Sequence, residues 1–389
     1  MRQVISTKNK PIKLWLNDME EGALVQARNL ANLPFTFKHV AIMPDSHQGY
    51  GMPIGGVLAT NGVVIPNAVG VDIGCGMCAL KTNLQEIETL VLKKIMSGIR
   101  ERVPLGFDHH KDCQNESLLP SLESVPKGGV VERQYVAALK QVGTLGGGNH
   151  FIEIQKGSDG HIWVMIHSGS RNIGLKVAAH YNKLAQKLNE RWYAQIPKSW
   201  DLAFLPIETQ EAHDYFAEMS YCVDFAFANR KLMMENIKEA FASELGAEFS
   251  ALDFINIAHN YARWENHYNT NVIVHRKGAT SAQEGEIGII PGSQGTKSYI
   301  VQGKGNPESF TSCSHGAGRA LGRKQAQRQL DLDAEIAKLD KQNIIHAIRS
   351  TKDLDEAPGA YKDIDVVMEN QKDLVDILVE LHPMAVIKG

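Results

Sequence analysis

The chain has 389 residues, of which 43% are hydrophobic and 22% charged, a balance typical of a globular protein rather than a disordered or fibrous one. A net charge of −3 excludes a global basic field for nucleic acid, although a local basic cleft is compatible with it. Five cysteines, an odd number in a large chain, do not indicate a disulfide framework. The first residues lack a secretory pattern and no apolar run reaches the roughly 18 residues of a membrane span, so we expect a cytoplasmic location.

Helical and β-like segments alternate irregularly along the chain. Helical periodicity occurs at 84–102, 131–141, 174–192, 208–246, 323–339 and 367–380, and the fourth segment is long enough for two helices. Short β-like runs occupy 55–66, where Asn61-Gly62 predicts a hairpin turn, and 161–167, 271–275, 287–291 and 298–302. Because the order shows no strict βα alternation, we expect an α+β fold of sheets surrounded by helices.

The first motif with chemical potential is GVDIGCGMC at 70–78. Its Gly-rich turn lets the carboxylate of Asp72 and the thiolate of Cys75 converge on one ion, and a thiolate can also bridge two ions. Alternatively, Asp72 is a turn cap and the cysteines are apolar filler. A redox pair or half a zinc site is a further reading of Cys75 and Cys78, but no second CxxC and no thioredoxin-like setting accompany them.

The second motif is GTLGGGNHFIEI at 143–154, in which three glycines allow close approach of the backbone to a ligand. His150 suits a metal ion through an imidazole nitrogen. Glu153 can only accept hydrogen bonds when ionised, as recognition of a guanine edge requires. The structural alternative is a glycine turn followed by a surface glutamate.

Two further histidines stand near turns. His167 ends the apolar run 161–167, and Arg171 follows near a predicted helix start, where a phosphate would be favoured. His259 and Asn260 are expected at the end of a helix within INIAHNYARWENH. Taken singly, each histidine is as compatible with a structural role as with a ligand.

The most informative region is 274–323, which contains VHRKGATSA, IIPGSQGTKSYIV and SCSHGAGRALGR. Its Lys, Arg, Ser and Gly residues in turns after strands suit a triphosphate or a nucleic-acid backbone. We expect His315 near the N-terminus of a helix, where the dipole keeps the imidazole neutral and nucleophilic. Such a histidine can attack phosphorus and carry a nucleotide as a phosphoramidate. The alternative is a helix cap or an RNA contact.

Taken together, these segments resemble the RtcB family of RNA-splicing ligases. The resemblance rests on motifs in the expected order over almost the whole chain: MPDSHQGYGMPIGG (43–56), GVDIGCGM (70–77), GTLGGGNHFIE (143–153), HSGSR (167–171), HNY (259–261), PGSQGTKSYIV (291–301), SCSHGAGR (312–319), EAPGAYKDIDVV (356–367) and Lys388-Gly389. It implies one α+β domain over 1–389, with β-sheets surrounded by helices and the active site in a central cleft.

The resemblance implies an RNA ligase that joins RNA 3′-phosphate or 2′,3′-cyclic phosphate ends to 5′-hydroxyl ends, in RNA repair or tRNA splicing. It would use GTP and two Mn²⁺ ions, through a GMP–histidine intermediate and an activated RNA-3′-pp-G end. By affinity alone such ligands would also accept Zn²⁺. Its substrates would be tRNA, rRNA or mRNA fragments with broken ends. Whether an activating protein is required is not readable from the sequence.

The resemblance also assigns residues. Cys75 would bridge the two ions, with His167 and His259 at one and Asp72 and His150 at the other. His315 would be the nucleophile. The residues implied at GTP are Asn149, Glu153, Asn260, Pro291, Gly292, Ser293, Gln294, Ser298, Gly316, Ala317, Gly318, Tyr361 and Lys388. Those implied at RNA or phosphate are Arg171 and Arg319.

Some positions depart from the family pattern. Leu321-Gly322 stands where a Met-Ser pair is expected, and Asn172-Ile173 replaces a Gly-Leu ending. Neither removes a ligand or the nucleophile, but both indicate a divergent branch, whose RNA substrate and partners can differ from those of the tRNA-splicing members. Two rival functions remain open at this point: a metal-dependent phosphoesterase that processes RNA ends without joining them, and a non-catalytic RNA-binding protein.

Overall fold

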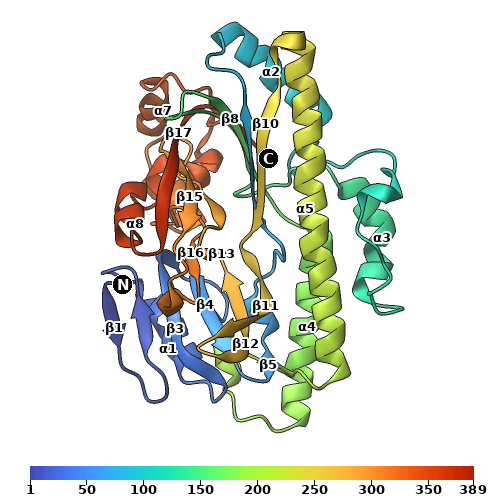
Figure 1. The fold of residues 1–389 in the computed structure, drawn as a ribbon, viewed down its shortest axis with the longest axis vertical. Coiled ribbons are helices and arrows are strands. Elements are labelled where there is room, and N and C mark those ends of the chain that lie inside the picture. The colour runs from blue at the N-terminus through green and yellow to red at the C-terminus, as the bar shows by residue number, and fades with distance from the viewer.

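Two large β-sheets form the centre of the computed structural model, which describes residues 1–389 (Figure 1). The six-stranded sheet has the order β1 (Gln3–Ile5), β2 (Ile12–Leu14), β3 (Thr36–His47), β4 (Ile54–Thr60), β12 (Thr270–Lys277) and β11 (Asn260–His267). The seven-stranded sheet has the order β10 (Ala251–Ala258), β6 (Gly76–Thr82), β8 (Ile162–Ser168), β7 (Phe151–Gly157), β17 (Val375–Lys388), β15 (Ser298–Gly303) and β14 (Ile287–Ile290). Two small sheets pair β13 (Ala279–Ser281) with β16 (Ser312–Ser314), and β5 (Val63–Val64) with β9 (Leu205–Pro206).

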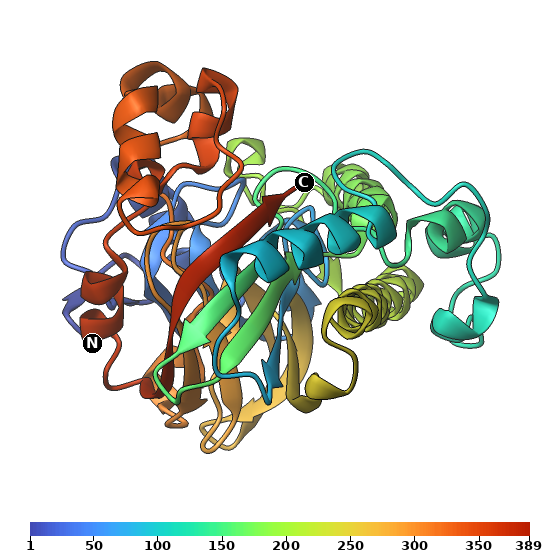
Figure 2. The same ribbon diagram turned by 90° about the horizontal axis from the view of Figure 1, so that it is seen from above.

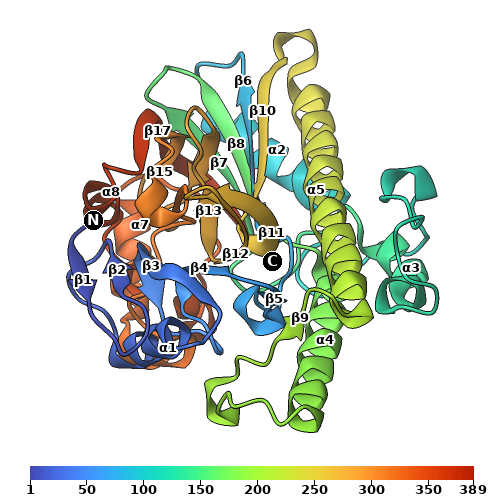
Figure 3. The ribbon, with the colours of Figure 1, turned by 60° about the horizontal axis from the view of Figure 1, so that its bottom comes forward.

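The helices cover the outer faces of these sheets. They are α1 (Glu21–Ala31), α2 (Thr89–Arg102), α3 (Val130–Gln141), α4 (Arg171–Arg191), α5 (Gln210–Leu245), α6 (Arg323–Gln329), α7 (Leu332–Asp340) and α8 (Ile364–Asn370). In Figures 1 and 3, α4 and α5 run along one side of the sheets, with α3 outermost. Figure 2 shows α2 lying across β7, β8 and β17. None of the helices is long and apolar enough to cross a bilayer.

Burial on both faces explains the composition of the central strands. All seven residues of β8, IWVMIHS, are buried, because α2 and α5 pack on one side and β14 and β15 contribute to a second apolar cluster on the other. A strand covered on both faces carries a nearly continuous apolar run rather than an alternating one. His167 and Ser168 are the polar exceptions, and they lie where β8 meets the cleft described below.

The mixed α+β fold is confirmed, and so are the strongly periodic helices. The segments 131–141 and 174–192 correspond to α3 and α4, and 208–246 is the single helix α5 of 36 residues. The Thr209 side chain caps the start of α5, and Gly246 follows its last residue with a positive φ of 56°. The predicted helix 84–102 corresponds to α2, which begins later than expected, at Thr89.

Other local predictions were wrong. The 367–380 segment is not one helix, because α8 ends at Asn370 and β17 begins at Val375. The 323–339 helix is split, because α6 ends at Gln329 and Asp331 begins a new helix by accepting a hydrogen bond from the Ala334 amide at the start of α7. Each segment carries apolar residues that fit a helical period, but the tertiary pairing of β17 and the cap at Asp331 override that pattern.

The predicted Asn61-Gly62 hairpin is also wrong. A turn is present, with Gly62 at φ 69°, but β4 pairs with β3 and β12 whereas β5 pairs with β9. The Thr60 hydroxyl donates to the Val63 carbonyl across the turn. The turn chemistry was therefore read correctly, but the strand partners come from distant parts of the chain.

Candidate active site

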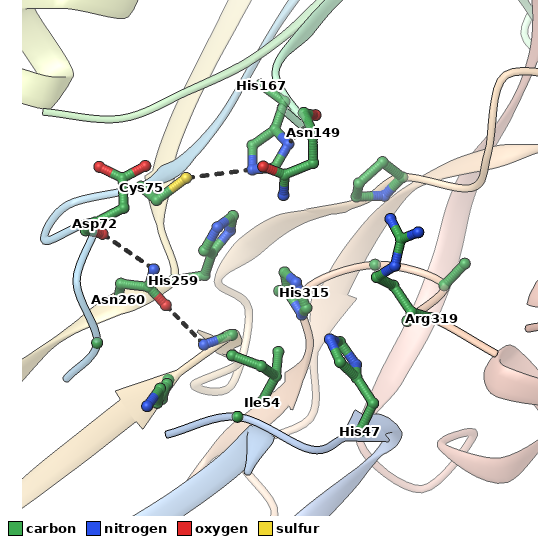
Figure 4. A pocket seen from close by; sticks show the side chains of 18 of the residues that line it. His47, Ile54, Asp72, Cys75, Asn149, His167, His259, Asn260, His315 and Arg319 are labelled. Atoms are coloured by element: carbon green, nitrogen blue, oxygen red, sulfur yellow. Dashed lines mark hydrogen bonds between the residues drawn. The ribbon is translucent and has the colours of Figure 1, made fainter. Parts of the chain in front are cut away.

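A cleft of about 430 Å³ opens between the two large sheets (Figure 4). Its walls include loops after β3, before β6 and after β16, together with the His167 end of β8. Figure 4 shows His315 between His259 and Arg319, with Cys75 and His167 beyond His259. The candidate residues from five sequence motifs therefore face one cavity.

Five side chains form two overlapping groups that suit metal ions. Asp72, Cys75 and His150 form one group, and Cys75, His167 and His259 form the other; in each group the ligand atoms lie within 4.8 Å of one another. The Cys75 Sγ is 3.3 Å from His167 Nε2 and 3.6 Å from His150 Nε2. Cys75 is thus the member that the two groups share.

The outer nitrogens of two histidines fix the orientation of their rings. His150 Nδ1 donates to the Leu145 carbonyl at 2.9 Å, and His167 Nδ1 donates to the Asn149 carbonyl at 3.1 Å. The Nε2 atom of each ring therefore lies on the side of Cys75, where it can bind a metal ion when it carries no proton. His259 Nδ1 is buried with no hydrogen-bond partner, so this nitrogen is free to act as a metal ligand.

The protonation states also suit a metal. Burial holds the pKa of His167 and of His259 well below the usual range, so both imidazoles are neutral. Burial raises the pKa of Asp72, but its contacts with His150 and Cys75 and the charge of Arg171 together bring the pKa below the ordinary value. The pKa of the Cys75 thiol is raised well above its usual value by burial and by Asp72, so thiolate formation depends on a bound cation.

His259 and Asn260 do not end a helix, so that prediction was wrong. They lie at the junction of β10 and β11, which belong to different sheets. The Asn260 side chain donates to the Asp72 carbonyl at 3.0 Å and accepts from the Gly278 amide at 2.7 Å. Asn260 therefore connects the Asp72 loop to the loop after β12 while lining the cleft.

His315 is not at a helix N-terminus either. It follows the short strand β16, and α6 begins only at Arg323. Its neighbour is instead Asp45 on β3, whose Oδ2 accepts from His315 Nδ1 at 2.6 Å and from the His315 amide at 3.1 Å. This geometry assigns the proton to Nδ1 and leaves the lone pair of Nε2 free.

Asp45 is a functional residue that sequence reasoning missed. Its side chain is fully buried, and burial raises its pKa, but the charge and hydrogen bond of His315 reverse the effect and the pKa lies below the ordinary value. Only its place directly after the apolar run VAIMP (40–44) could have signalled it. Its partner stands 270 positions away, so no local pattern links the two.

Gly318 allows the His315 loop to reach Asp45. It adopts a φ of 75°, and a Cβ there would lie 2.0 Å from the Asp45 carbonyl oxygen. Any other residue would push the loop away from β3. The predicted Gly316–Gly318 segment lines the cleft as a backbone surface beside His315.

A narrow second cavity, of about 20 Å³, adjoins the cleft. It shares residues Phe151, Gly292 and Tyr361 with the cleft, and its other walls are Glu153, Ser293, Gln294, Glu356, Val386 and Lys388. Strand pairing brings Glu153 and Lys388 to this cavity, because β17 lies against β7 with Lys388 opposite Phe151 and Val386 opposite Glu153. Six of the thirteen residues predicted at GTP therefore lie together here: Glu153, Gly292, Ser293, Gln294, Tyr361 and Lys388.

Glu153 and Ser298 are linked through Gln155. The Gln155 amide donates to Glu153 Oε2 at 2.5 Å and to the Ser298 hydroxyl at 3.1 Å, and this hydroxyl also accepts from the Gly292 amide. Burial raises the pKa of Glu153 well above the ordinary value, and Lys388 opposes this as the nearest cation. A carboxylate in this setting gains from any ligand that donates hydrogen bonds to it.

Glu356 is a second residue that sequence reasoning missed as a site member. Its buried carboxylate accepts from Tyr361 and lies 3.1 Å from an Arg319 nitrogen and 3.4 Å from Lys388 Nζ. Burial raises its pKa, but these cations and the Tyr361 hydroxyl bring it below the ordinary value. Glu356 thus holds three predicted site residues in place.

The two predicted phosphate contacts differ in position. Arg319 lines the cleft, with its guanidinium 5.2 Å from the centre of the Tyr361 ring. Arg171 does not line it: its side chain donates to the Thr144 hydroxyl and the Gly106 carbonyl behind the glycine loop. Of the other predicted contacts, Asn149 and Pro291 line the cleft, and the Gln294 amide donates to the Glu356 carbonyl.

Comparison with known proteins agrees with this geometry. The family model described as "tRNA-splicing ligase RtcB" matches residues 26–389. The chain is 38% identical to the RNA-splicing ligase RtcB of Escherichia coli strain K12 over 412 aligned positions, covering 100% of this chain and 99% of that relative. It is 32% identical to the tRNA-splicing ligase RtcB of Thermococcus kodakarensis, covering 95% and 92% of the two chains.

Proposed function

Because this chain belongs to the RtcB family of RNA-splicing ligases and is therefore an RNA ligase, we propose that it joins RNA 3′-phosphate or 2′,3′-cyclic phosphate ends to 5′-hydroxyl ends with GTP. We propose further that residues 1–389 work as one domain and that the reaction takes place in the cleft around His315. A cytoplasmic location and an RNA substrate from damaged or spliced tRNA, rRNA or mRNA belong to the same proposal.

One observation carries this proposal: a buried cysteine is shared by two ligand groups beside a histidine whose free nitrogen faces the same cavity. Two cations and a nucleophile are the components that phosphoryl transfer needs. A phosphoesterase could use the ions, but it has no need for the cavity lined by Glu153 and Lys388.

The donor set fits two Mn²⁺ ions. One cysteine sulfur, three imidazoles and one carboxylate are available, and Cys75 would bridge the ions, with Asp72 and His150 at one and His167 and His259 at the other. The bound ions would neutralise phosphate charge and orient an in-line displacement. Burial of the ligands supports the site, because it keeps water from competing for the ions.

His315 would carry the nucleotide. Its Nε2 would form a bond to the α-phosphorus of GTP as pyrophosphate leaves, while Asp45 holds the Nδ1 proton and stabilises the cationic imidazole that results. An oxygen of the RNA 3′-phosphate would then displace the histidine to give the RNA-3′-pp-G end. The 5′-hydroxyl would attack the 3′-phosphorus, losing its proton and releasing GMP. A cyclic end would first be opened by water.

The adjoining cavity supports a preference for guanine. Glu153 is suited to accept from the N1 and N2 hydrogens of guanine, Lys388 lies beside it, and Tyr361 would pack on the ring. Adenine offers no such pair of donors on that edge. Backbone and side-chain groups of Pro291–Gln294, Ser298, Asn149, Asn260 and Gly316–Gly318 would hold the remaining parts of the nucleotide, and Arg319 would face phosphate.

The test is to incubate the protein with α-labelled GTP and Mn²⁺ and to look for a covalent adduct. We expect an adduct with GTP, none with ATP, and none in His315→Ala. Ligation of a 3′-phosphate RNA to a 5′-hydroxyl RNA should disappear in the same variant.

Other results would favour the rival functions. Processing of RNA ends without any adduct would favour a phosphoesterase. RNA binding that is unaffected by Cys75→Ala, with no processing of ends at all, would favour a non-catalytic protein. An adduct that forms only after addition of a second protein would instead identify a required activator.

A further inference from the structure

Tyr50 presents an exposed aromatic ring at the mouth of the cleft. It lies between β3 and β4, lines the cleft beside His47 and Gln48, and is 73% exposed. Its ring takes part in none of the aromatic pairs of the molecule, and its hydroxyl makes no hydrogen bond. A large apolar side chain held open to solvent beside a reactive centre is a candidate contact for substrate.

The backbone beneath this ring is fixed. The Tyr50 carbonyl accepts from the buried Lys277 Nζ at 2.5 Å and from the Met52 amide at 2.7 Å. The Gln26 side chain donates to the Gly49 carbonyl at 2.7 Å and accepts from the Gly49 amide at 3.1 Å. The turn therefore does not rely on the Tyr50 side chain, which is left free to bind.

Gly51 shows how closely the turn is packed. It has a φ of 68°, and a Cβ there would lie 2.6 Å from the Asp201 carbonyl oxygen. The turn is thus held against the segment after α4 on one side and against Lys277 on the other. A rigid support lowers the entropy lost when a ligand binds to the ring.

We propose that Tyr50 is a stacking platform for an unpaired nucleobase beside the RNA break. The proposal rests on the proposed RNA-joining function. RNA ends that are being joined are single-stranded at the break, and proteins hold such bases on exposed aromatic rings. The rest of the cleft offers charged and polar groups for phosphate and nucleotide, whereas Tyr50 and Val71, at 73% and 51% exposure, are its only large exposed apolar side chains.

The first experiment compares Tyr50→Ala with Tyr50→Phe in ligation of a 3′-phosphate RNA to a 5′-hydroxyl RNA. Stacking on an aromatic ring predicts that alanine raises the RNA KM roughly five- to one-hundred-fold, whereas phenylalanine stays within about twofold of the unchanged protein. Tyr193→Ala is the matched control, because Tyr193 is 84% exposed but does not line the cleft. The proposal is overturned if Tyr50→Ala behaves like Tyr193→Ala, or if phenylalanine is as damaging as alanine.

The second experiment identifies the base. Each nucleotide next to the break is replaced in turn by an abasic one, and the loss in RNA affinity is measured in the unchanged protein and in Tyr50→Ala. Stacking predicts one position at which the abasic change weakens binding to the unchanged protein but adds nothing in Tyr50→Ala. If no position shows this coupling, the proposal is wrong.

Two readouts separate the possible failures. The slope of log affinity against log salt concentration should be the same in Tyr50→Ala as in the unchanged protein, because stacking releases no counterions. A reduced slope would show that the substitution acts through lost contacts between cationic side chains and phosphate, and would overturn the stacking role. Adduct formation with GTP alone, measured on the unchanged protein, tests the proposed function by itself. If the adduct forms but Tyr50→Ala has the same RNA KM as the unchanged protein, only the stacking proposal is rejected.

Discussion

At the scale of single residues, the contact between Asp45 and His315 fixes the tautomer of the proposed nucleophile. A histidine that attacks phosphorus through Nε2 must keep its proton on Nδ1, and the 2.6 Å contact with a fully buried carboxylate imposes this tautomer. The same carboxylate also binds the His315 amide, so the ring and the backbone are held by one group.

Asp45→Asn tests this pairing. The amide keeps the shape but can donate to Nδ1, which favours the wrong tautomer and leaves the imidazolium without a counter-charge. We expect formation of the His315 adduct to slow by roughly two to four orders of magnitude. The measurement is the single-turnover rate of labelled adduct, with the thermal unfolding midpoint as a check that the variant is folded. A rate equal to that of the unchanged protein would contradict the role of Asp45.

The sequence allowed prediction of the residues in recognisable motifs but not of the groups that support them. Cys75 and His150 stand in Gly-rich motifs, and the structure brings them together with His167, His259 and Asp72. Asp45 and Glu356 could not be predicted as partners of His315 and Lys388, because each pair joins distant segments through burial and geometry. Such pairing carries no periodicity and no spacing.

At the scale of elements, α5 supports the metal-ligand groups through Arg230. This fully buried side chain donates to the Gly74 carbonyl at 3.0 Å, the Ser168 carbonyl at 2.9 Å and the Asn256 side chain at 2.7 Å. Gly74 is next to Cys75 and Ser168 is next to His167, while Asn256 belongs to β10, the strand that precedes His259. One guanidinium therefore connects the three segments that carry the second ligand group.

Arg230→Leu should loosen this arrangement. Removing a supporting hydrogen-bond partner behind metal ligands typically costs about ten- to one-hundred-fold in metal affinity, and we expect a loss in that range for Mn²⁺. Competition with a chelator measures the affinity, and Lys231→Leu, at the next and exposed position of α5, is the control. Unchanged Mn²⁺ affinity in Arg230→Leu would show that Arg230 serves the fold alone.

His275 on β12 predicts how stability depends on pH. Its Nδ1 donates to the Leu58 carbonyl and its Nε2 accepts from the Ile65 amide, so only the neutral ring satisfies both neighbours. Burial lowers its pKa to about 4, whereas in the unfolded chain the value is about 6.5. Between these values the unfolded chain binds more protons, so this contribution to stability is complete above pH 6.5 and is lost as the pH falls toward 4.

We therefore expect the free energy of unfolding to fall by roughly 1–2 kcal/mol from His275 between pH 7 and pH 5. Urea unfolding at several pH values measures it. His39 and His47, with pKa values also lowered to about 4 by burial, add to the total slope. His275→Gln isolates the contribution, because glutamine can donate and accept but does not titrate. An equal pH slope in that variant would refute the assignment.

Helix and strand predictions succeeded where one period dominated a long segment. α5 has buried residues on one face from Ala212 to Phe241, and its pattern could be read directly. The strand at residues 375–388 was harder to predict from the sequence, because β17 shifts register against both neighbours and mixes exposed and buried positions without a regular alternation. The chain around His259 was misread as helical because two strands in different sheets join there without a turn signal.

At the scale of the whole molecule, the ligand groups join segments that lie far apart in the chain. The loop at Asp72, the turn at His150, the end of β8 and the β10–β11 junction contribute together. Ions bound to the two groups, which share Cys75, would link the seven-stranded sheet to the edge of the six-stranded sheet. Their binding free energy would add to the stability of the folded state.

We expect Mn²⁺ at about one hundred times its dissociation constant to stabilise the fold by roughly 2.7 kcal/mol, or a few degrees in the thermal midpoint. The comparison is a thermal scan with Mn²⁺ against one with a chelator. His315→Ala should keep most of the increase, whereas Cys75→Ala should lose it. An equal increase in Cys75→Ala would mean that the ion binds elsewhere.

The position of β17 has a consequence for how the protein is made on the ribosome. β17 alone connects the four strands β10, β6, β8 and β7 to β15 and β14, yet it comes after all of them in chain order. Until residues 375–388 have emerged, β7 and β15 both present open edges, which are templates for pairing with other chains. Translation that stops before residue 375 should therefore yield chains that aggregate or require a chaperone, rather than a partly active ligase.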